Sequence, residues 1–351
     1  MVRVMVVFGG RSGEHEVSLA SARAIMEALA GRHEVVPVGI TREGRWISSD
    51  DAMRELESRG DEITDGSSGP MARTEEKIPA TLGSVDVVFP VLHGPYGEDG
   101  TIQGMLELAG IPYVGSGVLA SAVGMDKLTM KKVFAHHGLP QVEWLGFTRS
   151  EWEDKGSALV REIESSLGYP CFVKPANLGS SVGINKAEDQ RELRRALEEA
   201  AEHDRRLIVE AGVNTREIEV SVLGNEAAEV SVPGEIVVKN NEFYDYEAKY
   251  SEGAMELIVP ADISDEATGE IRRMARTAYE AIDAAGMARV DFFLERETER
   301  LLINEINTIP GFTPTSVYSR LWAASGIPYE ELLERLVRLA LERHAKGLQH
   351  Q

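Results

Sequence analysis

The sequence predicts an α/β protein that opens with a βαβ open-sheet domain and continues into antiparallel sheet. Residues 2–8 form a continuous apolar run, which is typical of a buried parallel strand, and a helical pattern over residues 18–30 precedes a second strand at 34–40. Further along, residues 216–225 alternate between polar and apolar side chains, which is typical of a half-buried antiparallel strand. Ligands of open α/β sheets bind beyond the carboxyl ends of the strands, and Glu14 lies there, after the first strand.

The bulk composition is that of a globular protein with an acidic balance. The chain has 351 residues, of which 43% are hydrophobic and 27% charged, and its formal net charge is −21. This charge argues against nucleic acid or an anionic membrane as a partner. The apolar run at the start is short for a signal peptide, and no run approaches the ~18 apolar residues of a membrane span. Because Cys171 has no second cysteine to pair with, we expect a reducing, cytoplasmic location and a small core residue at this position.

Residues 287–316 contain a candidate metal site. They are predicted to form two strands joined by a charged turn, so Asp291, Glu305 and Asn307 converge if the strands pair as a hairpin. Two carboxylates and an amide oxygen, without His or Cys, suit Mg²⁺ or Mn²⁺ and argue against zinc. The alternative is a solvated acidic strand face. The flanking apolar residues indicate a buried sheet, which favours the metal interpretation.

One of two glycine-rich loops is a candidate for phosphate binding. Lys174 is the only charge in the predicted strand at 169–175, and the loop at 177–183 that follows is rich in glycine and serine. This loop lacks the spacing and the helix of a P-loop, so a plain tight loop is the alternative. The glycines of the loop at 9–13 do not have the spacing of a dinucleotide-binding fingerprint.

Three further segments carry polar residues whose roles stay open from the residues alone. His93 follows a predicted strand, level with Glu14, and is either a functional or a loop-stabilising residue. Residues 240–253 are aromatic and charged at once, and we interpret them as a mobile lid, with a small local core as the alternative. Residues 41–80 are predicted to be a polar excursion with a short helix near 51–59.

Several motifs, taken in chain order, resemble those of the D-alanine–D-alanine ligase family of the ATP-grasp superfamily. They are GGRSGEHEVS, HGPYGEDG, MDK, VKPANLGSSVG, REIEVSVLGN, FYDYEAKY, RVDFF and NEINTIPGFTPTS. The resemblance covers nearly the whole chain, and FYDYEAKY is its most diagnostic string. It implies an N-terminal α/β domain over residues 1–118 and then a two-part ATP-grasp fold. Its central subdomain would span residues 119–209, and its C-terminal subdomain, with the metal site, residues 210–347.

The resemblance implies ATP-dependent ligation of two D-alanine molecules for peptidoglycan synthesis. One D-alanine carboxylate would take the γ-phosphate of ATP and become an acylphosphate, which the amine of the second D-alanine would attack to displace phosphate. The family uses two Mg²⁺ or Mn²⁺ ions, which Asp291, Glu305 and Asn307 would hold, with Glu305 bridging them. Family members are commonly dimeric, so a homodimer is expected.

The resemblance also assigns residues to the amino-acid subsites. Glu14 would hold the ammonium group of the first D-alanine, with His93 nearby. Arg289 and the backbone N–H of Gly311 would stabilise the oxyanion of the intermediate. Ser316 would bind the carboxylate of the second D-alanine.

A second group of residues is implied to bind ATP. Lys127, Lys174 and Lys249 would neutralise its phosphates, Glu210 would contact the adenine, and Glu217 would contact the ribose hydroxyls. The remaining implied ATP contacts are Ser180, Ser181 and Val213.

Ser180 and Tyr250 are further implied to form a hydrogen-bonded network with Glu14 that orients the second substrate. Relatives that make an ester with D-lactate tend to carry Phe in place of Tyr250. Since this chain has Tyr, we expect it to form a peptide bond.

Three alternative functions remain to be weighed. A non-catalytic ATP-binding protein would be expected to have lost a metal ligand or Arg289, and the sequence keeps them. A dinucleotide-dependent oxidoreductase leaves the metal residues and the segment at 240–253 unexplained. Another ATP-dependent carboxylate–amine ligase is the runner-up, and FYDYEAKY and Ser316 argue against it.

Overall fold

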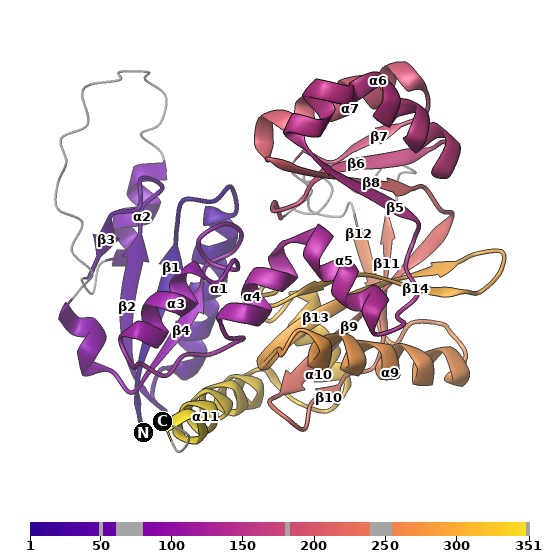
Figure 1. The fold of residues 1–351 in the computed structure, drawn as a ribbon. Coiled ribbons are helices and arrows are strands. Elements are labelled where there is room, and N and C mark those ends of the chain that lie inside the picture. Colours follow the sequence, from indigo (N-terminus) through magenta and orange to yellow (C-terminus); the bar gives the residue numbers. More distant parts are fainter. Residues whose placement is uncertain (49–51, 61–79, 180–182, 239–254, 349–351) are drawn as a thin grey trace, which may run out of the picture.

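The computed structural model describes residues 1–48, 52–60, 80–179, 183–238 and 255–348. These residues are arranged around three β-sheets (Figure 1). An N-terminal sheet stands to one side of a large C-terminal sheet, and a small sheet lies above the large one. The predicted α/β class and the N-terminal open-sheet domain are confirmed.

The N-terminal sheet is built on the apolar run at the start of the chain. Its strand order is β3-β2-β1-β4, in which β1, β2 and β4 are parallel and β3 is antiparallel at the edge. The strands are β1 (Arg3–Gly9), β2 (Glu34–Ile40), β3 (Trp46–Ile47) and β4 (Val87–Val91). Helix α1 (His15–Leu29) connects β1 to β2, which confirms the βαβ unit, although the helix begins earlier than the predicted residue 18.

Alternate side chains of β1 enter two different cores, because side chains alternate along a strand. Val4 and Phe8 pack with α1 and with the C-terminal helix α11 (Tyr329–Leu348), whereas Met5 and Val7 pack on the other face. Burial of both faces explains why this strand is a continuous apolar run. The other helical segments of the domain are α2 (Ala52–Gly60), a 3-10 helix (Ala80–Ser84) and α3 (Thr101–Leu108).

The large sheet is antiparallel and contains the predicted hairpin. Its order is β12-β11-β9-β13-β14, and β10 pairs with β9. The strands are β9 (Thr215–Gly224), β10 (Glu229–Val230), β11 (Gly234–Val238), β12 (Met255–Ile258), β13 (Gly286–Glu295) and β14 (Leu301–Asn307). In the hairpin Asp291 lies opposite Glu305 and Arg289 lies opposite Asn307, so the expected pairing is confirmed.

One face of the large sheet is closed by helices. Met274 of α9 (Asp265–Ala281) packs in one core with Val220 of β9. The same core includes Phe134 of α5 (Lys127–His136). Because helices occupy this face, the polar side chains of β9, β13 and β14 are left to line the opposite one.

The small sheet presents Lys174 on its open face. Its order is β5-β8-β6-β7, with β5 (Trp144–Thr148), β6 (Cys171–Pro175), β7 (Asn185–Ala187) and β8 (Arg206–Ala211). Helices α6 (Arg149–Ser166) and α7 (Gln190–His203) cover the other face, where Cys171 and Val173 are fully buried. Cys171 is therefore the core residue that was predicted, and Lys174 projects to the opposite side.

Helix α6 lies in a segment for which the sequence analysis gave no element. Its start carries a capping box, in which the Thr148 hydroxyl accepts from the Glu151 N–H and the Glu151 carboxylate accepts from the Thr148 N–H. The buried positions of the helix are only Val160 and Ile163. An apolar stripe this narrow gives a weak periodic signal, so the T-x-x-E spacing was the better indicator.

Helix α11 ties the C-terminal part of the chain to the N-terminal sheet (Figure 1). His33 Nε2 lies 3.0 Å from a carboxylate oxygen of Glu334, and Arg343 donates to the carbonyl oxygen of Gly115 at 2.7 Å. The N-terminal sheet and the large sheet thus contribute to one hydrophobic core, which includes α11. The remaining helices are α4 (Val118–Met125) and α10 (Val317–Ala324).

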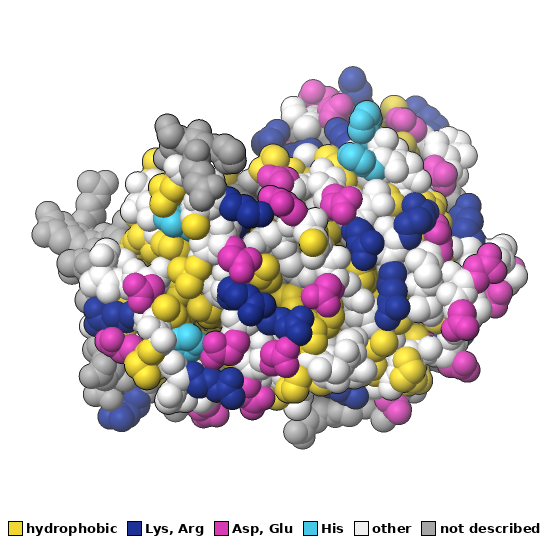
Figure 2. All heavy atoms as spheres, turned by 90° about the horizontal axis from the view of Figure 1, so that it is seen from below, with side chains coloured by type: hydrophobic (Ala, Val, Ile, Leu, Met, Phe, Trp, Pro, Cys, Tyr) yellow, Lys and Arg dark blue, Asp and Glu magenta, His cyan; other side chains and the backbone are white. Residues whose placement is uncertain are grey.

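Two observations on the described residues concern membrane-spanning helices and surface charge. None of their helices combines the length and apolar character needed to cross a bilayer. Figure 2 shows acidic and basic side chains interspersed over the face seen from below, without a broad basic region on it. Nucleic-acid binding usually needs such a region.

Candidate active site

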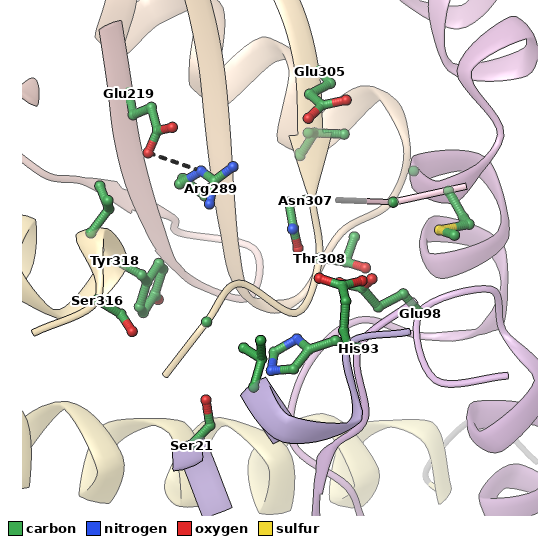
Figure 3. Close-up of a pocket in the computed structure, with 18 of the residues that line it drawn as sticks. Ser21, His93, Glu98, Glu219, Arg289, Glu305, Asn307, Thr308, Ser316 and Tyr318 are labelled. Carbon is green, nitrogen blue, oxygen red and sulfur yellow. Dashed lines mark ion pairs between the residues drawn. The ribbon is translucent and has the colours of Figure 1, made fainter. Parts of the chain in front are cut away.

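Two adjoining cavities lie on the open face of the large sheet. The first, of about 560 Å³, is formed with loops of the N-terminal domain, and the second, of about 290 Å³, is formed with the small sheet. Ile184, Glu219, Arg289 and Glu305 line both cavities, so the two meet at the hairpin. Figure 3 shows Arg289, Glu305 and Asn307 on neighbouring strands at this junction.

Two loops of the N-terminal domain bring Glu14 and His93 to the first cavity, as predicted. The Ser12 hydroxyl donates to the carbonyl oxygen of His93 at 2.6 Å and accepts from the Glu14 N–H at 3.2 Å, which joins the two loops. Burial lowers the pKa of His93, so its imidazole is neutral at pH 7. Its Nδ1–H donates to the carbonyl of Ile309 at 2.9 Å. Nε2, which has no hydrogen-bond partner among the described residues, is then an acceptor.

Arg289 is held in place by two carboxylates of the large sheet. Its Nε and one terminal nitrogen each lie 2.7 Å from an oxygen of Asp291. Its Nε also lies 3.0 Å from Glu219 on β9. Since the guanidinium is planar and its partners fix its plane, Arg289 presents its remaining N–H groups in a defined direction at the junction of the cavities.

The donor set of the hairpin fits a hard divalent cation. Among the described residues no three His, Cys, Asp or Glu side chains gather into a metal-binding group, and the predicted set contains only two carboxylates. Asp291 and Glu305 lie opposite each other, and the Asn307 side-chain oxygen is held by the Ile309 N–H at 2.9 Å. Oxygen ligands of this kind suit Mg²⁺ or Mn²⁺, which keep several waters or substrate oxygens in their coordination shell.

Lys127, at the start of α5, reaches the junction from the side. Its ammonium donates to the carbonyl oxygen of Leu178 at 2.8 Å and lies 3.8 Å from a carboxylate oxygen of Glu305. Asp126 caps the helix by accepting from the Thr129 N–H at 2.8 Å. The cap fixes the first turn of α5, and so fixes where Lys127 leaves the backbone.

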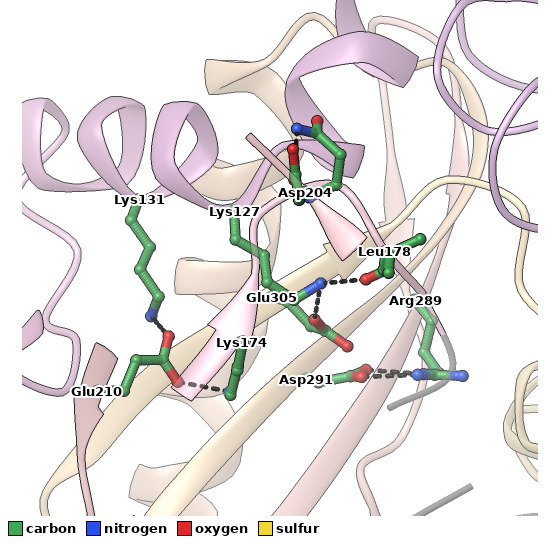
Figure 4. Close-up of polar contacts among 10 residues, drawn as sticks. Lys127, Lys131, Lys174, Leu178, Asp204, Glu210, Arg289, Asp291 and Glu305 are labelled. Carbon is green, nitrogen blue, oxygen red and sulfur yellow. Dashed lines mark hydrogen bonds and ion pairs between the residues drawn. The ribbon is translucent and has the colours of Figure 1, made fainter. Parts of the chain in front are cut away.

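Glu210 is bound between two lysines in the second cavity (Figure 4). The Lys131 ammonium lies 2.9 Å from one of its oxygens, and the Lys174 ammonium lies 2.5 Å from the other. Burial by itself would raise the pKa of Glu210, but the two ammonium groups outweigh it and lower the pKa to about 2. Glu210 is therefore a permanent anion at neutral pH.

The loop after β14 brings Gly311 and Ser316 to the first cavity. The Ser316 hydroxyl oxygen accepts from the Thr313 N–H at 3.0 Å. The Phe312 N–H donates to the Ser21 hydroxyl of α1 at 3.1 Å, which anchors this loop to the N-terminal domain. Figure 3 shows Ser21 and Ser316 on the side of the cavity away from Glu305.

The structure also places the remaining predicted residues, where it describes them. Val213 and Glu217 line the second cavity together with Lys174 and Glu210. Four predicted site residues lie outside the described part of the chain, and so does the whole of the expected lid at residues 240–253. They are Ser180, Ser181, Lys249 and Tyr250.

Three residues at the site were not identified from the sequence. Glu219 lies two positions after Glu217 on an alternating strand, so it shares that strand's open face and could have been found. Lys131 lies one helical turn after Lys127, on the same side of α5. Glu98, which lines the first cavity, stands in the HGPYGEDG motif with no local pattern to single it out.

The fold and the site define a class of protein: an ATP-grasp protein, in which two antiparallel sheets face each other across a lysine-lined cavity beside an acidic hairpin. Family models for the N-terminus and the C-terminus of D-Ala-D-Ala ligase match residues 3–116 and 133–338. The chain belongs to the D-Ala-D-Ala ligase family.

Relatives of known name and structure agree with this placement. The chain is 49% identical to a D-alanine–D-alanine ligase of Geobacillus thermodenitrificans, over 97% of this chain and 96% of the relative. It is 51% identical to one of Heliobacterium modesticaldum, over 97% and 95%. Among solved structures, the D-alanine-D-alanine ligase of Coxiella burnetii has a TM-score of 0.81 and 34% identity, over 99% of this chain and 98% of that one. A D-Ala:D-Ser ligase of Enterococcus faecalis has a TM-score of 0.81 and 37% identity, over 97% and 99%.

Proposed function

We propose that this protein joins two D-alanine molecules into D-alanyl-D-alanine, with ATP as co-substrate, and so serves peptidoglycan synthesis. The observation that carries the proposal is the position of Arg289 between two chemically different cavities. One is lined by Lys174 and suits a nucleotide, and the other is lined by Glu14 and Ser316 and suits an amino acid. A group transferred from one cavity to the other passes this guanidinium.

The amino-acid cavity would carry out the bond-forming step. A carboxylate is a poor electrophile, and phosphorylation by ATP gives it a leaving group. Glu14 would hold the ammonium of the first D-alanine, with His93 beside it, and Ser316 would bind the carboxylate of the second. Arg289 and the Gly311 N–H would stabilise the oxyanion that forms when the amine attacks, because preorganised donors need no reorganisation at that moment.

The nucleotide cavity would bind ATP. Lys127, Lys174 and Lys249 would neutralise the phosphates, Glu210 would accept from the adenine amino group, and Glu217 would accept from the ribose hydroxyls. The low pKa of Glu210 supports its role as an acceptor. The further ATP contacts of this proposal are Ser180, Ser181 and Val213.

We include a metal site in the proposal. Asp291, Glu305 and Asn307 would hold two Mg²⁺ or Mn²⁺ ions, with Glu305 contacting both. Such ions, when bound, neutralise charge on a transferring phosphoryl group. The oxygen-only donor set on the paired strands supports this assignment.

The identity of the second substrate depends on a residue outside the described part of the chain. Tyr250, with Ser180 and Glu14, would orient an attacking amine, which favours D-alanine over D-lactate. The similar structure from Enterococcus faecalis is named a D-Ala:D-Ser ligase, so D-serine is the acceptor to test against D-alanine.

Phosphate release from ATP and Mg²⁺ tests the reaction class. We expect release with D-alanine and none with L-alanine, and we expect mass spectrometry to find D-alanyl-D-alanine as the main product when D-alanine and D-serine are supplied equally. Release that is indifferent to the amino acid would reject the ligase, and a mainly D-serine product would reassign the second substrate.

The organisation of the protein is part of the same proposal. The N-terminal domain would span residues 1–118, the central subdomain 119–209 and the C-terminal subdomain 210–347, in a cytoplasmic homodimer. Exposed apolar side chains on α3 and α4, of which Leu108 is 93% exposed, support self-association. Size-exclusion chromatography with light scattering measures the molar mass and so tests the homodimer.

A further inference from the structure

Glu98 is a buried carboxyl group in the amino-acid cavity with no role in the function proposed above. It follows β4 in the same loop as His93, is 7% exposed and lines the first cavity. One carboxylate oxygen accepts from the Gly94 N–H at 2.6 Å, which fixes the side chain within its loop. Figure 3 shows Glu98 beside His93 and Thr308, directed into the cavity.

Gly94 brings Glu98 close to Glu14, although the two glutamates come from different loops. A Cβ atom added to Gly94 would lie 3.2 Å from a carboxylate oxygen of Glu14. The N–H of the same glycine donates to Glu98. Both carboxyl groups therefore approach one residue, and Ser12 holds the two loops together by its hydrogen bonds to His93 and Glu14.

The pocket around Glu98 holds more carboxyl groups than cations. Burial and the neighbouring Glu14 raise the pKa of Glu98 to about 8, against the opposing effect of Arg289. The charged or titratable groups around Glu98 are Glu14 at the start of α1, His93 in its own loop, Arg289 on β13 and Glu305 on β14. Because Arg289 is already paired with Asp291 and Glu219, it cannot fully compensate a further carboxylate.

We propose that Glu98 is a second ligand of the ammonium group of the first D-alanine, which it contacts together with Glu14. This inference rests on the proposed function. A primary ammonium has three N–H donors in a tetrahedral arrangement, so a single carboxylate leaves donors without a partner in a buried site. Glu14 and Glu98 supply two acceptors from two sides, and the acceptor Nε2 of His93 lies in the same cavity. The substrate ammonium would add positive charge to a pocket in which carboxyl groups outnumber cations.

The substitution Glu98→Gln separates this role from a structural one. Its amide oxygen can still accept from the Gly94 N–H, so the loop is preserved. The side chain can no longer ionise when the ammonium group binds. We expect the KM for the first D-alanine to rise by about 10-fold or more, since hydrogen bonds to charged groups contribute this much, while the KM for ATP stays within about 2-fold. The matched control is Asp99→Asn, the next residue, which accepts from the Tyr96 and Thr101 N–H groups and should change neither value.

A ligand that lacks the ammonium makes the test specific. Binding of a phosphinate analogue of D-alanyl-D-alanine is compared with binding of the same molecule without its amino group. Glu98→Gln should weaken the first by about 10-fold and leave the second unchanged. Equal weakening of both, or of neither, would overturn the inference.

Two further controls keep the outcome decisive. If Glu98→Gln does not fold, as judged by its thermal transition, Glu98→Asp takes its place, because it keeps the charge but withdraws it by one methylene. An unchanged ratio of the two analogue affinities in Glu98→Asp would also overturn the inference. Wild-type protein that fails to release phosphate with D-alanine would refute the proposed function itself, whatever the Glu98 variants show.

Discussion

Glu210 and Glu98 are both buried, at 3% and 7% exposure, yet at neutral pH Glu210 is ionised and Glu98 is mostly protonated. The pKa of Glu210 is lowered to about 2 because Lys131 and Lys174 outweigh the effect of burial. The pKa of Glu98 is raised to about 8 because burial and Glu14 act in the same direction. Burial alone thus does not decide the charge of a carboxyl group, and the nearest partner does.

This difference distinguishes the two cavities that we propose for ATP and for the amino acids. In the cavity proposed for ATP, Lys131 and Lys174 balance the charge of Glu210 before any ligand arrives. In the cavity proposed for the amino acids, Glu14 and Glu98 would pair with the ammonium group of the substrate. ATP would therefore meet an anion at Glu210 that the protein has already fixed in place. The first D-alanine would instead supply the cation that pairs with Glu98.

The largest expected effect is at Glu305, one of the residues that line both cavities. Glu305→Gln should lower kcat by about 1,000-fold and leave the fold intact, because a neutral amide cannot replace a carboxylate at the hairpin junction. Phosphate release at limiting Mg²⁺ measures this, and the thermal transition confirms folding. Glu297→Gln, in the exposed turn of the same hairpin, is the control. Wild-type rates in Glu305→Gln would remove the metal assignment.

The next test breaks the charge balance of the nucleotide cavity. Lys131→Met should lower the free energy of unfolding by about 3 kcal/mol, because it removes one partner from a buried ion pair. It should also raise the KM for ATP, since Glu210 is no longer held from both sides. Denaturant unfolding and initial rates measure the two effects. Lys132→Met, at the exposed neighbouring position, should change neither, and a similar loss of stability in both variants would contradict the special role of Lys131.

The dependence of stability on pH tests the raised pKa of Glu98. The folded pKa of Glu98, about 8, lies above its usual value of 4.5, so the native state binds more protons between these values and stability falls as pH rises. From pH 5 to 7 the wild type should lose about 2 kcal/mol relative to Glu98→Gln. Urea unfolding of both proteins across this range measures the difference. Parallel curves would show that Glu98 does not titrate there.

The opposite sign holds for Glu210. Its folded pKa, about 2, is below the usual value of 4.5, so its contribution to stability is present above pH 4.5 and is lost as pH falls toward 2.

The smallest expected effect concerns the choice of nucleophile. Tyr250→Phe should retain activation of D-alanine, weaken dipeptide synthesis and gain some D-alanyl-D-lactate, most visibly at low pH, where the competing amine is more protonated. Product analysis by mass spectrometry with equal D-alanine and D-lactate, across about pH 6 to 9, measures the ratio. Tyr246→Phe serves as the control. The absence of ester from Tyr250→Phe at every pH would show that this hydroxyl does not select the acceptor.

The sequence by itself determined most of the strands and the face of each on which its side chains lie. The apolar run of β1, the alternation of β9 and the hairpin that sets Asp291 opposite Glu305 follow from side-chain periodicity and from turn chemistry. The same reasoning singled out Glu14 and His93, which follow predicted strands, and the structure places both in one cavity. These features are local, because a strand or helix fixes the direction of its own side chains whatever it later packs against.

Only the tertiary structure decided which charged groups lie next to each other. Lys131 of α5 pairs with Glu210, which lies on a strand of the small sheet. Glu98 lies near Glu14 because Ser12 joins their two loops. These partners are far apart in the sequence, and no period connects them. The pKa of a buried group depends on the charges nearest to it. The opposite pKa shifts of Glu210 and Glu98 therefore could not be deduced before the elements that carry their partners were packed together.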